Sequence, residues 1–320
     1  MKKYKVCVSD GRHPRFDIEQ EAIEKMGWEF VMCQCRTEDD VIKYCGDADA
    51  IFLDGAPITA RVISHLKNCK VINRYGVGYE NVDVEAATKA GIKVTYVPDY
   101  CMEDVSDMAL ALLMTCLRQV SLRDRKMKEG GWNIYATAFR LKGKTLGLLG
   151  FGRIARTLAR KCSGFGLEKI IAFDPFVSDE VFKQAGVERG TLEEVLSCAD
   201  FLSLHMPING ETRHILNDTT LRLMKPTAIL VNTARGALID SFALADALKE
   251  GRLLYAGLDV HEYEPMTEQC PYLHLDNAIV TDHSAYNTEE GVIELKTKAA
   301  QNVIDVLLGQ PLTYPINKLN

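Results

Sequence analysis

The sequence lacks an apolar run long enough to cross a membrane. Its most apolar stretch, residues 108–117, is bounded by Asp107 and Arg118 and falls far short of the roughly 18 residues that a transmembrane helix needs. The apolar stretch near the N-terminus stops at Ser9 and Asp10, before the core of a signal peptide could form. These absences predict no membrane partner and, by default, a cytoplasmic location.

An excess of basic residues is also missing. Lys and Arg together number 38 against 44 Asp and Glu, which gives a formal net charge of −6. No basic run is available to follow a phosphate backbone. The composition therefore predicts no nucleic-acid partner.

The ten cysteines form no CxxC motif. The close pair Cys33 and Cys35 has no neighbouring His to complete a zinc site, so we predict no metal. Several other cysteines lie in apolar runs, such as Cys7 in VCV and Cys116 in TCL. This pattern favours free buried thiols over disulfides.

The sequence does contain a repeated alternation of apolar runs and helical patterns, and its 320 residues suggest about two domains. The first half alternates YKVCV, WEFVMC, AIFLDG, KVINRY and IKVTYVP with helical segments. A long helical pattern then runs from about Met102 to the pair Gly130 and Gly131. After it, six strand-like runs follow: KTLGLLG, KIIAFD, FLSLHMP, TAILVNTA, LLYAGLDV and AIVTDHSA. Such alternation is typical of βαβ units and parallel sheets.

Helix boundaries are marked by local signals. Thr37 with Asp40 and Thr191 with Glu194 predict capping boxes, and Asp240 predicts another helix start. A final amphipathic pattern, from about Thr288 to Leu308, is expected to return to the first domain.

A glycine-rich turn follows the strand-like run KTLGLL. Gly150 and Gly152 belong to GFGRIA, a GxGxxG-type motif with Ala155 in the last position, and a helical pattern begins there. Gly150 permits the tight turn, and Gly152 lets the backbone approach a pyrophosphate at the helix N-terminus. Because glycine-rich turns between a strand and a helix also arise for packing reasons, a second feature is needed to predict a dinucleotide site.

Asp174 supplies that feature. It ends the next strand-like run, 22 residues after Gly152, close to the roughly 20 expected of the acid that binds the ribose hydroxyls. A carboxylate there would repel a 2′-phosphate, and Pro175 and Phe176 follow where an NADP site would favour Arg. The sequence predicts NAD as cofactor.

A second glycine cluster, RYGVGY from Arg74, follows KVIN. Its spacing is not that of a dinucleotide motif, but its backbone N–H groups could form an anion site for a small carboxylate.

Three charged residues follow strand-like runs of the second half: Arg235, Glu264 and His283. In an open parallel sheet the loops beyond the carboxyl ends of strands form the ligand crevice, so these residues can converge. Ketone reduction needs a group that delivers a proton near neutral pH, which His283 can do. Glu264 could hold the imidazole, and Arg235 could grip a substrate carboxylate through two parallel hydrogen bonds.

With these blocks the sequence resembles the D-isomer-specific 2-hydroxyacid dehydrogenases, a family that includes phosphoglycerate dehydrogenases, glyoxylate and hydroxypyruvate reductases and the C-terminal binding proteins. The resemblance covers nearly the whole chain. It rests on GLLGFGRIA with Asp174, HMPINGETRHIL, MKPTAILVNTARGALID, GLDVHEYEP and DHSAY.

The resemblance implies an α/β fold of two doubly wound parallel-sheet domains around a cleft, and commonly a homodimer. Residues 1–101 and 288–320 would form a flavodoxin-like substrate domain, and residues 102–287 a Rossmann NAD-binding domain. Arg235, Glu264 and His283 would be the catalytic trio. The implied NAD contacts are Gly150, Gly152, Arg153, Ile154, Asp174, His205, Met206, Pro207, Thr212, Thr233, Ala234, Arg235, Asp259, His283 and Ala285.

The substrate site is expected to comprise the Arg74 loop with Val77 and Gly78, together with Arg235 and His283. Arg74 could bind a second anionic group of the substrate or buttress its own loop.

Two positions depart from the family pattern. Asp282 stands where Pro usually precedes the histidine; it could act on His283 or face solvent. Tyr286 stands where relatives carry Trp, Gly or other residues, and with Tyr100 it could line the pocket.

The leading hypothesis is an NAD-dependent dehydrogenase acting on a small 2-keto or D-2-hydroxy acid. An NAD(H)-sensing protein of the C-terminal binding protein type is the alternative, since GVGYENVD and VPDYCMEDVSDMAL look similar there. A relative using formate is disfavoured by Glu264, because those enzymes carry Gln at this position. As the chain ends at Asn320, no appended regulatory domain is expected.

Overall fold

The computed structural model describes residues 3–13 and 15–319. The chain divides into two compact units, one formed by Met1–Cys101 with Thr288–Asn320 and the other by Met102–Asn287. Each unit contains one sheet, and every strand pairing within both sheets is parallel. The predicted α/β class with two parallel sheets is confirmed.

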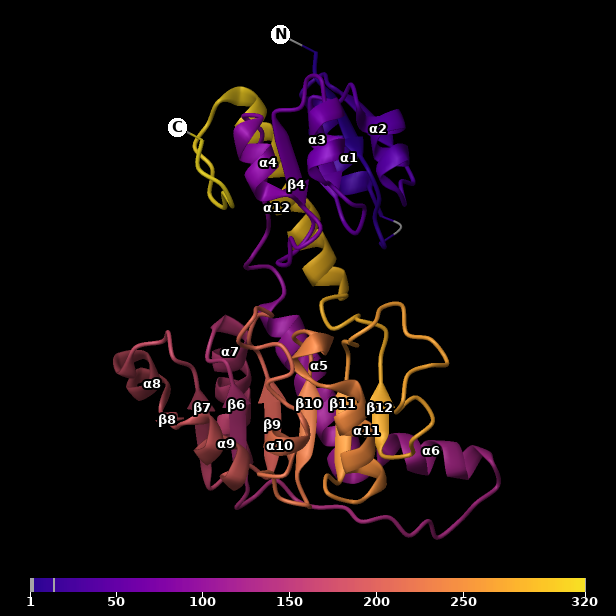
Figure 1. The fold of residues 1–320 in the computed structure, drawn as a ribbon, viewed down its shortest axis with the longest axis vertical. Helices are drawn as coiled ribbons and strands as arrows, with labels where there is room; N and C mark the ends of the chain where they lie inside the picture. The colour runs from indigo at the N-terminus through magenta and orange to yellow at the C-terminus, as the bar shows by residue number, and fades with distance from the viewer. Residues whose placement is uncertain (1–2, 14, 320) are drawn as a thin grey trace. The chain divides into compact units, whose positions relative to one another are not determined.

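In the described residues of the first unit, five strands lie in the order β2-β1-β3-β4-β5, the flavodoxin-like order. Its last helix, α12, packs against α1 and β4, although it is separated from them by the whole second unit in sequence (Figure 1). The strands are β1 (Lys5–Val8), β2 (Glu29–Met32), β3 (Ala50–Leu53), β4 (Val71–Arg74) and β5 (Lys93–Thr95), and the helices are α1 (Asp17–Lys25), α2 (Glu38–Cys45), α3 (Ala60–His65), α4 (Val84–Lys89) and α12 (Glu289–Leu308).

The second unit has seven strands in the order β12-β11-β10-β9-β6-β7-β8 (Figure 1). The six strands that come first in the chain, β6 to β11, are arranged as in the Rossmann fold. The side of the sheet to which successive strands are added changes at β6. The strands are β6 (Thr145–Leu149), β7 (Lys169–Phe173), β8 (Glu188–Arg189), β9 (Phe201–Leu204), β10 (Ile229–Asn232), β11 (Tyr255–Leu258) and β12 (Ala278–Val280). The helices are α5 (Met102–Arg118), α6 (Val120–Lys128), α7 (Arg153–Cys162), α8 (Asp179–Ala185), α9 (Leu192–Cys198), α10 (Asp218–Leu221) and α11 (Ser241–Lys249), with short 3-10 turns at Ser163–Phe165 and Gly236–Leu238.

Apolar side chains cover both faces of this second sheet. Leu146 and Leu148 of β6 belong to the core under α5 and α7, whereas Leu149 belongs to the core under α9 and α11. A strand buried on both faces reads as a continuous apolar run, which is why KTLGLL lacks the alternation of a half-exposed strand.

Two expectations about elements are corrected. The sheet has seven strands instead of six, because β8 adds two exposed residues that form no apolar run. The single long helix from Met102 is two helices, bent by 61° where Gln119 adopts a left-handed backbone conformation with φ of 58°.

The predicted helix boundaries are confirmed. Thr37 and Thr191 form capping boxes with Asp40 and Glu194, and Asp240 accepts hydrogen bonds from two N–H groups at the start of α11. All ten cysteines are free thiols.

Within the part of the chain that the structure describes, no single helix is long and apolar enough to span a membrane. The bent pair α5 and α6 has the required length and apolar composition only when the two helices are taken together, and seven residues of α5 are buried.

Candidate active site

The glycine-rich turn joins β6 to α7. Gly150 has a φ of 88°, and its N–H group donates to the Phe173 carbonyl of β7 at 2.8 Å. A Cβ atom on Gly150 would lie 2.8 Å from backbone atoms of both His205 and Met206. The turn therefore requires glycine on two grounds, and the segment after β9 lies directly beside it.

Gly152 stands in open space. A Cβ atom there would meet nothing within 4 Å, and its backbone is extended, with φ of −73° and ψ of −163°. Arg153 and Ile154 form the first turn of α7, whose N–H groups favour an anion. Nothing in the protein itself requires glycine at 152, which fits a residue kept small for a ligand.

Asp174 is fixed by the same turn. One carboxylate oxygen accepts from the Phe151 N–H at 2.8 Å, and the other accepts from the Phe176 N–H at 2.9 Å. The acid at the end of β7 is thus oriented by the turn that would hold the pyrophosphate.

The segment after β9 adds His205, Met206 and Pro207. His205 Nε2 lies 2.9 Å from Ser203 Oγ, and burial lowers the pKa of His205 to about 4. The ring is therefore uncharged near neutral pH. The Thr212 hydroxyl donates to the Pro207 carbonyl at 2.7 Å and closes the turn that follows.

Arg235, Glu264 and His283 follow β10, β11 and β12, which are neighbours in the sheet. His283 Nδ1 lies 2.7 Å from Glu264 Oε2. Glu264 Oε1 accepts from the His261 N–H at 2.9 Å. Burial opposes ionisation of Glu264, but the hydrogen bonds from His283 and His261 outweigh it and hold its pKa below the usual range.

The loop that carries Arg235 meets the Glu264 loop through a glycine. A Cβ atom on Gly236 would lie 1.9 Å from the His261 carbonyl carbon, so the two backbones are in direct contact. The Arg235 guanidinium donates to the Ala234 carbonyl at 2.7 Å, and its own carbonyl accepts from the Asn232 side chain at 2.9 Å.

Asp259 holds the His283 loop. It is fully buried, and its two oxygens accept from the Thr281 hydroxyl at 2.6 Å and from the N–H groups of Ser284 and Ala285 at 3.0 Å each. His283 itself has a φ of 57°, a conformation that a non-glycine residue adopts only when its surroundings fix it. The resemblance implies a contact between Asp259 and NAD; in the structure its carboxylate binds this loop.

His261 is a residue that sequence reasoning missed. Its ring is buried and contacts the Tyr272 hydroxyl at 3.2 Å and the Thr281 carbonyl at 2.8 Å. It is the first residue of the HEYEP block, but no characteristic spacing to another motif distinguishes this histidine from an ordinary core residue. Tyr286, which was predicted, lies edge-on to the His283 ring at 6.4 Å between centroids.

The predicted substrate loop lies in the first unit. Arg74 is 3.7 Å from Asp54, and a Cβ atom on Gly76 would lie 2.5 Å from Arg74 Nη1 and 3.3 Å from the Tyr100 hydroxyl. The structure thus brings Arg74 and Tyr100 together over Gly76. Arg74 thus contacts Asp54, which follows β3, and lies over its own loop, in which Val77 is 41% exposed.

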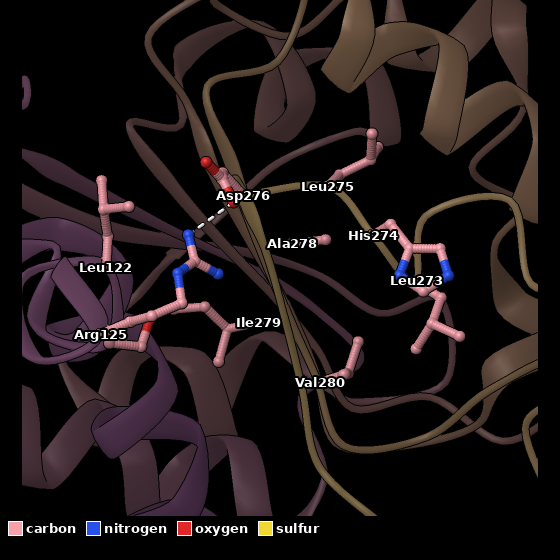
Figure 2. A pocket seen from close by; sticks show the side chains of 10 residues that line it. Leu122, Arg125, Leu273, His274, Leu275, Asp276, Ala278, Ile279 and Val280 are labelled. Atoms are coloured by element: carbon pink, nitrogen blue, oxygen red, sulfur yellow. Dashed lines mark hydrogen bonds and ion pairs between the residues drawn. The ribbon is translucent and has the colours of Figure 1, made fainter. Parts of the chain in front are cut away.

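A cavity of about 370 Å³ lies elsewhere in the second unit, lined by residues of α6 and by the segment that leads into β12 (Figure 2). Arg125 pairs with Asp276 across it at 2.6 Å. It contains none of the residues predicted to bind NAD or substrate, so it is not the candidate site.

The residues present fit a nicotinamide dinucleotide. Gly152 leaves space beside a helix N-terminus, Asp174 is aimed by that turn, and Thr233 Oγ is buried without a hydrogen-bond partner among the described residues. A buried hydroxyl without a partner is costly unless a ligand satisfies it.

Comparisons with known proteins agree with this geometry. Residues 110–285 match the family profile described as "D-isomer specific 2-hydroxyacid dehydrogenase, NAD binding domain". The chain belongs to this family. A glyoxylate reductase of Korarchaeum cryptofilum is 40% identical over 88% of this chain and 85% of its own length.

Two further relatives in the 2-hydroxyacid dehydrogenase family are informative. A D-3-phosphoglycerate dehydrogenase of Methanocaldococcus jannaschii is 37% identical over 99% of this chain, which spans only 60% of that protein. The crystal structure of a glyoxylate reductase from Paecilomyes thermophila superimposes with a TM-score of 0.87 at 31% identity and covers 99% of both chains. This 2-hydroxyacid dehydrogenase is therefore an NAD-dependent oxidoreductase that transfers hydride between the nicotinamide and a 2-keto or 2-hydroxy acid.

Proposed function

We propose that the chain reduces a small 2-keto acid of the glyoxylate or hydroxypyruvate type with NADH, with Arg235, Glu264 and His283 as its catalytic residues. The observation that carries the proposal is the 2.7 Å contact between His283 Nδ1 and Glu264 Oε2 beyond the ends of β11 and β12. The names of two similar proteins, a glyoxylate reductase and a hydroxypyruvate reductase, support this substrate class.

Bound NADH would supply the hydride that reduces the carbonyl carbon. Because Nδ1 of His283 is engaged by Glu264, the ring's Nε2 is the atom that can give a proton to the carbonyl oxygen. Arg235 would bind the substrate carboxylate by two parallel hydrogen bonds. In the opposite direction the same His283 nitrogen would accept the proton of the hydroxyl group.

We further propose that the NAD contacts and substrate contacts predicted from the sequence hold, and that NAD is preferred to NADP because of Asp174. Homodimerisation through the NAD-binding unit and a cytoplasmic location are also proposed, on the resemblance and on the sequence respectively. Size-exclusion chromatography with light scattering tests the first, and fractionation of the source cells tests the second.

The catalytic proposal is tested with His283→Gln and Glu264→Gln. We expect turnover, followed as loss of NADH absorbance against glyoxylate, hydroxypyruvate, phosphohydroxypyruvate and pyruvate, to fall by about 10²–10⁴-fold in His283→Gln. NADH binding, followed by fluorescence, should persist in both variants. A His283→Gln protein that binds NADH with unchanged affinity and keeps full turnover would overturn the role of His283.

The chain offers a matched control. His274 also pairs with a glutamate, Glu268, at 3.0 Å, but both side chains are largely exposed. His274→Gln should leave turnover unchanged. Binding of NADH without turnover of any keto acid by the unmodified protein would favour the NAD(H)-sensing alternative.

A further inference from the structure

Three cysteines that are distant in sequence meet in the first unit. The sulfur atoms of Cys7, Cys33 and Cys45 lie within 4.8 Å of one another. They come from three elements: Cys7 from β1, Cys33 from the residue after β2, and Cys45 from the last position of α2. In the sequence we considered only residues near Cys33 and Cys35 in the chain, whereas the fold brings Cys7 and Cys45 to Cys33 from other elements.

The pairing of strands explains why these thiols converge. Cys7 lies opposite Val31 in the parallel register of β1 and β2, so Val31 and Cys7 share a face. Side chains two residues apart on an extended chain point the same way, and the chain continues to pair past β2, since the Cys33 N–H donates to the Val8 carbonyl at 2.9 Å and the Cys35 N–H to the Ser9 carbonyl at 2.8 Å. Cys33 and Cys35 therefore follow Cys7 onto the face that α2 covers.

A fourth thiol lies close by. Cys35 packs in the same apolar cluster as Cys7 and Cys45, with Cys33 against it, although its sulfur is not one of the three that lie within 4.8 Å of one another. Cys7, Cys35 and Cys45 are buried, with exposed fractions of 0%, 3% and 0%, while Cys33 is half-buried. We call these four residues the thiol cluster. Three of its thiols are buried, and the half-buried Cys33 is the one that remains partly accessible to solvent.

We propose that the thiol cluster is a binding site for a thiophilic metal ion of the Zn²⁺ class, with Cys7, Cys33 and Cys45 as ligands and Cys35 as a neighbouring thiol in the same core. Thiolates bind Zn²⁺ at about 2.3 Å in a tetrahedral arrangement, which places ligand sulfurs about 3.8 Å apart. The three sulfurs lie within 4.8 Å of one another, so each pair would have to close by about 1 Å at most to reach that spacing. Binding releases the thiol protons to solvent and requires no oxidant.

A disulfide fits the cluster less well. It would need two sulfurs at about 2.05 Å, would use only two of the thiols, and would need an electron acceptor.

The test uses the full, untagged chain, reduced and handled without oxygen. Titration with Co²⁺ should produce thiolate-to-metal charge-transfer absorption that saturates at one ion per chain, and Zn²⁺ should displace the Co²⁺ in a metal analysis after gel filtration. Zn²⁺ should also raise the melting temperature, since a ligand of the folded state stabilises it. Absence of the charge-transfer bands would overturn the proposal.

Cys33→Ser is the main variant because its side chain is half-buried, and Cys45→Ala is the second. Each should weaken Zn²⁺ binding by about 100-fold or more while its far-UV circular dichroism stays unchanged. Cys69→Ser and Cys198→Ser, which change half-buried thiols outside the thiol cluster, should bind as the unmodified chain does. Equal loss in these controls, or an intact mass showing loss of two hydrogens within the thiol cluster of the untreated protein, would contradict the metal site.

Discussion

Lys296 and Glu19 form an ion pair at 2.6 Å in the interior of the first unit, with side-chain exposures of 3% and 0%. The Tyr75 hydroxyl donates to the same Glu19 oxygen at 2.6 Å, and the Lys296 ammonium lies about equally close to the rings of Phe16 and Tyr75. Burial lowers the pKa of Lys296 although Glu19 opposes that shift. Because Tyr75 belongs to the predicted substrate loop, its hydrogen bond to Glu19 links this loop to the buried ion pair.

Lys296→Met should therefore be strongly destabilising. Removing one partner leaves a buried charge uncompensated, which costs about 3–5 kcal/mol, and urea unfolding should show it as a lower midpoint. The double variant Glu19→Gln with Lys296→Met should recover most of that loss. Lys89→Met, which breaks the exposed pair with Glu85, should leave the midpoint unchanged; an equal effect of the two lysine changes would contradict the interpretation.

The two glycines of the turn after β6 should respond differently to alanine. Gly150→Ala meets backbone at 2.8 Å from a φ of 88°, so we expect a loss of about 2–4 kcal/mol of unfolding free energy. Gly152→Ala meets nothing within 4 Å and should change stability by less than about 0.5 kcal/mol.

The NADH affinity of Gly152→Ala should nevertheless fall by about tenfold or more, because its Cβ atom would occupy the space proposed for the pyrophosphate. Fluorescence titration measures this. Unchanged NADH affinity in a folded Gly152→Ala protein would remove the turn from the cofactor site.

Asp174→Asn tests the cofactor preference. The substitution keeps one oxygen to accept a backbone N–H but removes the charge that would repel a 2′-phosphate. We expect the ratio of kcat/KM with NADPH to that with NADH to rise by about tenfold. Asp179→Asn, an exposed acid on α8 that pairs with Arg189, is the control of equal charge, and a ratio that rises there too would point to net charge alone.

His205 predicts a pH dependence of stability. Its pKa in the folded chain is about 4 against an ordinary value of 6.5, so the unfolded chain binds a proton that the folded chain excludes between these values. Stability is therefore complete above about pH 6.5 and is lost as the pH falls toward 4. The expected loss at about pH 5 is about 2 kcal/mol.

The measurement is urea unfolding at about pH 7.5 and about pH 5 for the unmodified chain and for His205→Gln, which cannot take up the proton. The variant should show the smaller decrease. His274→Gln changes an exposed ring and should behave as the unmodified chain; an unaltered pH dependence in His205→Gln would refute the assignment.

Much of the fold can be predicted from local patterns in the sequence. The strands within the runs KTLGLL and TAILVNTA are buried along their whole length, which is why these runs are mostly apolar. β8 was missed because Glu188 and Arg189 are exposed and pair only at the sheet edge. The break at Gln119 was missed because glutamine is an ordinary helix residue, and its left-handed conformation depends on the surrounding packing.

The candidate active site also has some features that the sequence predicts and others that it does not. The turn after β6 and Asp174 are related by a fixed spacing along the chain, which the sequence displays. The roles of His261 and Asp259 depend on hydrogen bonds to a loop 20 to 26 residues further on. The thiol cluster was hidden for the same reason, since Cys7 and Cys45 acquire their relation to Cys33 only through strand register and the placement of α2.

The placement of α12 also has a consequence for the order of events during synthesis. The second unit is one continuous segment, so all its strands have been synthesised before residue 288 is added. The first unit starts earlier, but α12 and its Lys296 are translated only after the whole second unit. Until then the nascent first unit holds Glu19 without its cation and an uncovered apolar surface, so we expect it to complete its fold after the second unit although its first strands are translated earlier.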